Sequence, residues 1–158
     1  MTNKEKYAEF CKKEKTIPIF SQPWWLDAVC GDDNWDVIMV ENDGQIEAVM
    51  PFHKKKYFSF NLITMPPLTQ TLGPWISSSI SEKYYKQLSR EKNLITQLIK
   101  GLPAFDYYAQ HFGNTITNWL PFYWNVFSQT TRYSYIIRDL SDPEKVFSEF
   151  SHAKRKNI

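Results

Sequence analysis

The stretch Trp35-Asp36-Val37-Ile38-Met39-Val40-Glu41-Asn42-Asp43-Gly44-Gln45-Ile46-Glu47-Ala48-Val49-Met50-Pro51 decides the fold class of this chain. Two strand-like runs, residues 35–40 and 45–51, flank the Asp43-Gly44 pair. Asp-Gly supplies the positive backbone angles that a tight turn needs, so the two runs are predicted to pair as an antiparallel hairpin. Residues 60–65 form a third strand-like run.

Two short helices are predicted before this hairpin. Residues 3–14 carry apolar side chains at helical spacing. A second helix is predicted to begin at Ser21 as its N-cap, with Pro23 in the first turn, and to end before Gly31.

Two capping-box patterns indicate helices after the third strand. Ser79 with Glu82 is predicted to open a long helix that ends at Gly101, and Ser141 with Glu144 a last helix with a buried stripe. Between them we expect a fourth strand over 105–111, a loop over 113–121, and a closing strand pair over 124–128 and 131–139. The fold class is therefore α/β in the α+β sense, with a mixed, mostly antiparallel sheet flanked by helices.

Composition favours a single domain over residues 1–158. The chain has 158 residues, 42% of them hydrophobic and 16% aromatic, which is enough for one core. A net charge of +2 is too small to indicate a nucleic-acid partner. Because no charged-then-apolar leader and no run of roughly 18 apolar residues is present, we predict a cytoplasmic protein without a membrane span.

Few residues indicate metal or covalent chemistry. Cys11 and Cys30 lie in helical patterns, where a free cysteine packs as a small hydrophobe. His53, His111 and His152 lie far apart without paired spacing. We therefore predict no metal site, and the catalytic residues stay unassigned.

The irregular segment that follows the third strand is the main candidate for a binding loop. It reads Ile63-Thr64-Met65-Pro66-Pro67-Leu68-Thr69-Gln70-Thr71-Leu72-Gly73-Pro74-Trp75. The proline pair should stop the strand, and Gly73 permits a backbone angle that is closed to other residues. Trp75 offers a flat surface for a ligand or for the core.

Several phrases, taken together and in order, resemble the N-terminal half of FemABX-like proteins. These are two-lobed transferases in which both lobes have the GNAT acyltransferase fold. The phrases lie at residues 20–29, 35–56, 62–75, 120–127, 132–140 and 155–158. The resemblance implies a GNAT-like lobe whose C-terminal partner lobe is missing, and that lobe is the expected partner, with a homodimer as the alternative.

The resemblance also implies an activity. Family members move an acyl or aminoacyl group onto an amine in the cleft between the lobes, so acyl-CoA or aminoacyl-tRNA is expected for the full protein and no cofactor for this chain. Acyl-CoA-binding GNAT domains hold the pyrophosphate with a Gln/Arg-x-x-Gly-x-Gly/Ala loop. Residues 70–75 match its first half only, because Pro74 has no N–H and Trp75 is bulky.

Six residues are the resulting candidates for substrate binding, although core packing is the competing reading for each aromatic residue. They are Gln70, Thr71, Gly73, Trp75, Trp119 and Tyr123. The leading hypothesis is one lobe of a cytoplasmic N-acyltransferase, inactive as an isolated chain. The alternative is a catalytically inactive, acyltransferase-like binding or interaction domain.

A third and weaker hypothesis is a single-stranded nucleic-acid binder. It rests on the run Lys54-Lys55-Lys56, which precedes Tyr57 and Phe58. Short basic runs are more often solvated strand ends, so we expect a strand end and a hairpin turn here.

Overall fold

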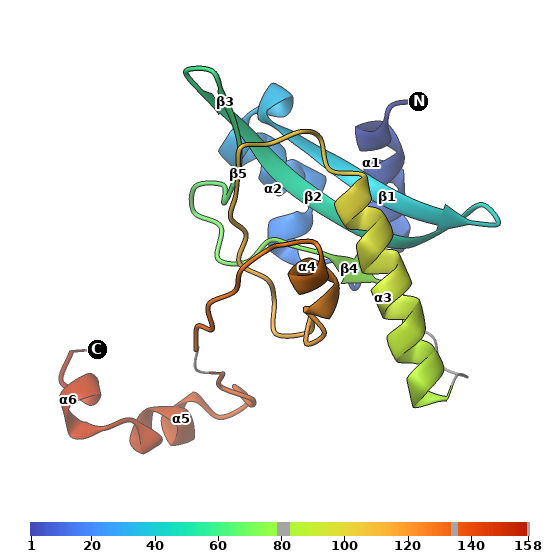
Figure 1. The fold of residues 1–158 in the computed structure, drawn as a ribbon. Helices are drawn as coiled ribbons and strands as arrows, with labels where there is room; N and C mark the ends of the chain where they lie inside the picture. Colours follow the sequence, from blue (N-terminus) through green and yellow to red (C-terminus); the bar gives the residue numbers. More distant parts are fainter. Residues whose placement is uncertain (79–82, 134–135, 158) are drawn as a thin grey trace. The chain divides into compact units, whose positions relative to one another are not determined.

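The computed structural model describes residues 1–78, 83–133 and 136–157. The chain divides into two compact parts, Met1–Ser128 and Gln129–Ile158 (Figure 1). The elements of the first part are α1 (Asn3–Lys13), η1 (Ile19–Ser21), α2 (Pro23–Cys30), η2 (Asp32–Asn34), β1 (Trp35–Asn42), β2 (Gln45–Tyr57), β3 (Phe60–Thr64), β4 (Trp75–Ile76), α3 (Tyr84–Lys100), β5 (Tyr107–Tyr108) and α4 (Leu120–Trp124). The second part holds α5 (Pro143–Glu149) and α6 (His152–Arg155). That all 158 residues form one lobe stays a prediction.

One sheet organises the first part. Its strand order is β1-β2-β3-β5, and β4 pairs with β2 beside this path. The pairs β1/β2, β2/β3 and β2/β4 are antiparallel, whereas β3 and β5 run parallel across the connection that contains α3. The predicted mixed, mostly antiparallel sheet flanked by helices is confirmed.

The predicted hairpin forms at the predicted residues. Asp43 and Gly44 have φ angles of 49° and 78°, as a two-residue hairpin turn requires. The register pairs Asn42 with Gln45 and shifts at a bulge between Val40 and Glu41.

The side chains of β1 and β2 contribute to two separate cores, because successive side chains of a strand point to opposite faces of the sheet. One face packs against α1 and α2, and the other against α3 and α4 (Figure 1). The first core contains Tyr7, Cys11, Ile17, Leu26, Trp35, Val37, Val49 and Leu72. The second contains Val40, Ala48, Met50, Leu94, Ile95, Leu98 and Phe122.

The two leading helices form as predicted, but the N-cap of α2 is a correction. Gln22 is its N-cap, and Ser21 instead lies buried in η1, where its carbonyl accepts a hydrogen bond of 2.7 Å from Tyr7 Oη. The hydrogen bond from the buried Tyr7 to its carbonyl therefore holds Ser21 in η1. Gly31 ends α2 with φ 77°, as predicted.

The long helix α3 is confirmed, and its C-cap is Gly101. The capping box predicted at Ser79 and Glu82 lies outside the described residues. The fourth strand is shorter than predicted, since only Tyr107–Tyr108 pairs with β3. A short strand missed by the sequence, β4, forms at Trp75–Ile76.

The predicted closing strand pair is wrong for the described residues. Residues up to Trp124 belong to α4, and the described residues of 125–133 and 136–139 form no strand. Pro121 suits the first turn of α4, and Asn125 Nδ2 donates a 2.7 Å hydrogen bond to the carbonyl of Pro121. Burial of Phe122 in the second core therefore favours a helical turn over an extended chain.

The last predicted helix exists with two corrections. Asp142, not Ser141, is the N-cap of α5, and its side chain accepts from the N–H of Lys145. The expected buried stripe is absent, since α5 has no buried residue and Phe147 is 38% exposed. Over the described residues, no helix combines the length and the apolar character needed to cross a membrane.

Val126 provides a test of the backbone at the end of α4. It has φ 68° and is 94% exposed, so a β-branched side chain takes a left-handed conformation without burial in return. We expect Val126→Gly to raise the free energy of unfolding by about 1 kcal/mol, measured by urea denaturation. Val126→Ala keeps the Cβ and should gain less. A Val126→Gly variant less stable than the wild type would contradict this backbone conformation.

Candidate functional site

A groove of about 470 Å³ lies in the first part, between β4, α3 and the loop before α4. Its lining combines hydroxyl and amide groups with apolar side chains and two charged side chains. The lining residues are Thr16, Pro18, Pro74, Trp75, Ile76, Ser77, Ser78, Gln87, Arg90, Glu91, Ile95, Thr115, Ile116, Thr117 and Asn118.

The sheet and α3 together position this lining. β4 pairs with Ala48 and Val49 of β2, and the N–H of Ser77 continues the ladder with a 2.8 Å hydrogen bond to the carbonyl of Glu47. α3 buries its apolar stripe against the sheet, which leaves Arg90 and Glu91 of its N-terminal half at the groove.

Arg90 is held firmly and its charge is neutralised. Its guanidinium donates to the carbonyl and to the hydroxyl of Ser77, at 2.8 and 2.7 Å, and lies 3.5 Å from Glu47 Oε1. Both side chains of the ion pair are largely buried, 21% and 28% exposed. Arg90 therefore fixes the wall of the groove, with its donors directed to protein acceptors.

Glu91 differs from its neighbour. It is half-buried in the groove, and among the described residues it has no hydrogen bond or ion pair. Because Glu47 compensates the charge of Arg90, the carboxylate of Glu91 gives the groove a net negative charge. A buried or half-buried carboxylate without a partner favours a cationic or hydrogen-bond-donating ligand.

Trp75 lies at the groove in a fixed orientation. Its Nε1 donates a 3.0 Å hydrogen bond to Thr16 Oγ1, and its ring meets Phe10 edge-to-face at 5.4 Å between centroids. The hydroxyl and the N–H of Thr16 bind the carboxylate of Glu14 and hold the pKa of that group below its usual value. One predicted substrate-binding residue is thus part of the groove.

Gln70, Thr71 and Gly73 do not line the groove. Gly73 does not use the positive φ that glycine permits. It is needed for space, because a Cβ there would lie 2.4 Å from Cδ1 of Phe112. The loop is held by a 2.7 Å hydrogen bond from the N–H of Leu72 to the carbonyl of His111.

The loop does not lead directly into a described helix. Residues 74–83, which include β4, separate Gly73 from the first residue of α3. A phosphate loop needs the N–H groups of a helix N-terminus beside it. Pro74 is buried and has no N–H, so residues 70–75 lack the geometry of a pyrophosphate cradle.

Trp119 and Tyr123 lie around α4, also outside the groove lining. Trp119 is half-buried against the second core, and its ring meets that of Tyr123 edge-to-face at 5.4 Å. Tyr123 is 59% exposed. A binding role for these two and for Gln70, Thr71 and Gly73 stays a prediction.

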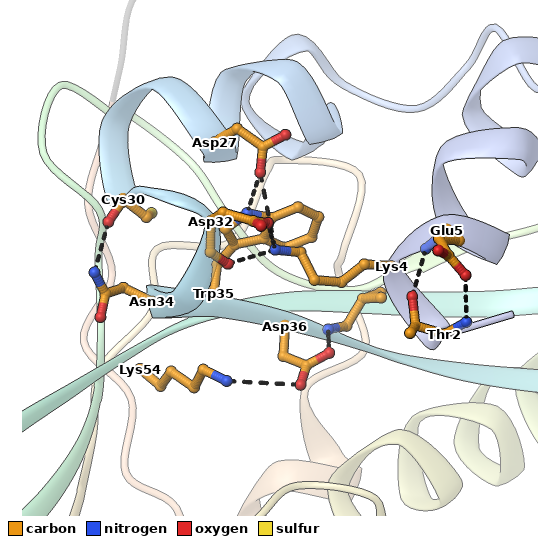
Figure 2. A network of polar contacts seen from close by, with 11 residues as sticks. Thr2, Lys4, Glu5, Asp27, Cys30, Asp32, Asn34, Trp35, Asp36 and Lys54 are labelled. Atoms are coloured by element: carbon orange, nitrogen blue, oxygen red, sulfur yellow. Dashed lines mark hydrogen bonds and ion pairs between the residues drawn. The ribbon is translucent and has the colours of Figure 1, made fainter.

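A second polar cluster joins α1 to β1 (Figure 2). Lys4 contacts Asp32, lies 3.9 Å from Asp27, and stands 4.2 Å over the ring of Trp35. Trp35 Nε1 donates a 2.7 Å hydrogen bond to Asp27, and Asp36 pairs with Lys54 at 3.8 Å. These groups satisfy one another, so the cluster acts as a clamp between elements.

Comparison with known proteins gives little beyond this geometry. No protein-family model matches the chain, and no curated protein matches it. A similar solved structure is that of the ribosomal-protein-alanine N-acetyltransferase from Brucella melitensis biovar Abortus 2308. It is 11% identical, with a TM-score of 0.44 over 87% of this chain and 93% of that chain. At that level the likeness does not transfer an activity.

Gly73 offers a test of the loop in front of the groove. Gly73→Ala should lower the free energy of unfolding by about 2 kcal/mol, since the added methyl group must displace the ring of Phe112. Urea denaturation measures this loss. Gly113→Ala is the matched control, because the nearest atom to its Cβ, Thr115 Oγ1, lies 3.8 Å away and little change is expected. Equal stability of the two variants would disprove the close approach.

Proposed function

We propose that this chain is one lobe of a GNAT- or FemABX-like N-acyltransferase, and that its groove receives the amine acceptor. The observation that carries the proposal is the Glu91 carboxylate, which is unpaired among the described residues and lines the same groove as Trp75. A carboxylate and an aromatic ring together suit an ammonium group. The resemblance to FemABX-like proteins, whose acceptors are amines, agrees with this choice.

The chemistry would be direct transfer. The acceptor nitrogen attacks the acyl carbonyl, the new C–N bond forms, and the bond to the thioester sulfur or ester oxygen of the donor breaks. Before the attack, Glu91 takes one proton from the bound ammonium group, which frees the nitrogen lone pair, and the leaving sulfur or oxygen takes the second proton that the nitrogen loses. This direct transfer requires no covalent enzyme intermediate. Acyl-CoA or aminoacyl-tRNA would bind to the rest of the full-length protein.

The acceptor assignment can be tested on the chain as it stands. Nα-acetyl-lysine methylamide, which has one free amine, should bind in an NMR titration, and its Nε-acetylated form should not. Glu91→Gln should weaken amine binding about tenfold or more while the melting temperature stays unchanged, because the lost charge has no described protein partner. Glu149→Gln, which alters a carboxylate of α5, is the matched control. Equal affinity of wild type and Glu91→Gln would refute the proposal.

A catalytically inactive binding domain is the second candidate. It is favoured by the failed phosphate loop, in which Pro74 is buried and Trp75 is engaged with Thr16. A groove that binds amines without any acyl transfer by the full-length protein would select this alternative.

The same geometry predicts that the isolated chain does not bind acetyl-CoA tightly. Pro74 has no N–H, the N–H of Leu72 donates to the carbonyl of His111, and no helix begins within residues 70–75. Calorimetry with acetyl-CoA should therefore give a dissociation constant above the micromolar range. Submicromolar binding would show that another part of the chain forms the donor site.

A further inference from the structure

The turn that joins β2 to β3 carries three exposed aromatic side chains. Tyr57, Phe58 and Phe60 are 58%, 86% and 52% exposed. Tyr57 pairs with Phe60 across the ladder, and Phe58 lies with Ser59 in the two-residue turn itself. In Figure 1 this turn projects at the end of the β2–β3 ribbon, beyond the helices of the first part. Large apolar groups thus gather at one protruding end.

The backbone of Phe58 is in a strained conformation. Its φ angle is 51°, a left-handed conformation that hairpin turns normally give to Gly, Asn or Asp. Its ring meets that of Tyr57 edge-to-face, with centroids 4.7 Å apart. An exposed aromatic residue in a strained turn contributes little to folding, and such outliers point to function.

Two lysines stand directly behind these rings. Lys54 is paired with Asp36, but Lys55 and Lys56 have no ion pair among the described residues. As neighbours in a strand they point to opposite faces, so a positive charge flanks the tip on each side. The nearby carboxylate of Asp106 already accepts a 2.7 Å hydrogen bond from the N–H of Asn61.

We propose that the β2–β3 tip inserts into an anionic lipid surface, with its aromatic rings in the interface and Lys55 and Lys56 at the headgroups. A strand rises about 3.3 Å per residue, which places the lysines roughly 7 to 10 Å behind Phe58. The boundary between headgroups and acyl chains has a depth of about 5–10 Å. Aromatic residues favour this boundary, and lysines favour anionic headgroups.

A lipid surface fits this tip better than single-stranded nucleic acid does. Base stacking uses rings set along one face, with cations that follow the phosphates. Here Phe58 is at the extreme end and the lysines flank the ribbon on opposite faces, so the tip is suited to end-on contact. The inference is independent of the groove and of the acyl transfer proposed for it.

Vesicle sedimentation tests the proposal. The chain should sediment with vesicles of phosphatidylcholine and phosphatidylserine (7:3) at 0.1 M NaCl, and much less with phosphatidylcholine alone. Phe58→Gly should reduce the bound fraction at least fivefold while the melting temperature rises or stays constant, since glycine relieves the strained turn. Val126→Gly is the matched control, because it relieves a second exposed left-handed residue and should bind as the wild type does.

The lysines make a separate prediction. Lys55→Gln with Lys56→Gln should remove the preference for phosphatidylserine, and 0.5 M NaCl should do the same to the wild type. Equal binding of wild type and Phe58→Gly, or no sedimentation with either vesicle, would overturn the proposal. Binding to a single-stranded oligonucleotide with no binding to vesicles would overturn it in favour of nucleic acid.

Insertion depth can be read with a probe in the turn. Ser59→Cys places an exposed thiol at the tip. Burial raises the pKa of Cys11 and of Cys30 to about 11, so the tip thiol should react first with an environment-sensitive maleimide. A blue shift of the label on anionic vesicles is the expected result, and an unshifted spectrum on sedimented protein would place the contact elsewhere.

Discussion

The strand β2 is the constraint on which the rest of the first part depends. It pairs with β1, β3 and β4, and its alternate residues feed both hydrophobic cores. A slip of one residue in its register would exchange the two faces, so that Val49 and Met50 would each enter the wrong core. The groove also depends on β2, because the carbonyl of Glu47 accepts a hydrogen bond from the N–H of Ser77 and its carboxylate forms an ion pair with Arg90.

The sequence was most informative where local chemistry decides the backbone. The Asp43-Gly44 turn, the end of α2 at Gly31 and the end of α3 at Gly101 depend on neighbours along the chain, and each is where it was predicted. The predictions were wrong where a contact between residues far apart in the sequence determines the backbone conformation. Ser21 is fixed by Tyr7, and the segment around Phe122 turns helical because the second core receives its ring.

The candidate site could be predicted only in part for the same reason. Trp75 was singled out as an aromatic residue in an irregular loop, and it does line the groove. Glu91 and Arg90 gave no such signal, because charged residues on an amphipathic helix usually face solvent. Only the pairing of β4 with β2 shows that this stretch of α3 borders a groove, and that pairing involves two residues.

The bulge between Val40 and Glu41 has a consequence for how copies of this protein meet one another. β1 ends the strand order, so its outer backbone groups have no described strand partner. Such an edge invites edge-to-edge growth into aggregates. The extra residue of the bulge is Glu47 of β2, and a bulge increases the local twist of the paired strands. The ion pair of Lys6 with Glu41 places charges at the same point of β1. Both features oppose the addition of a second chain, which protects the strand from self-pairing at high concentration.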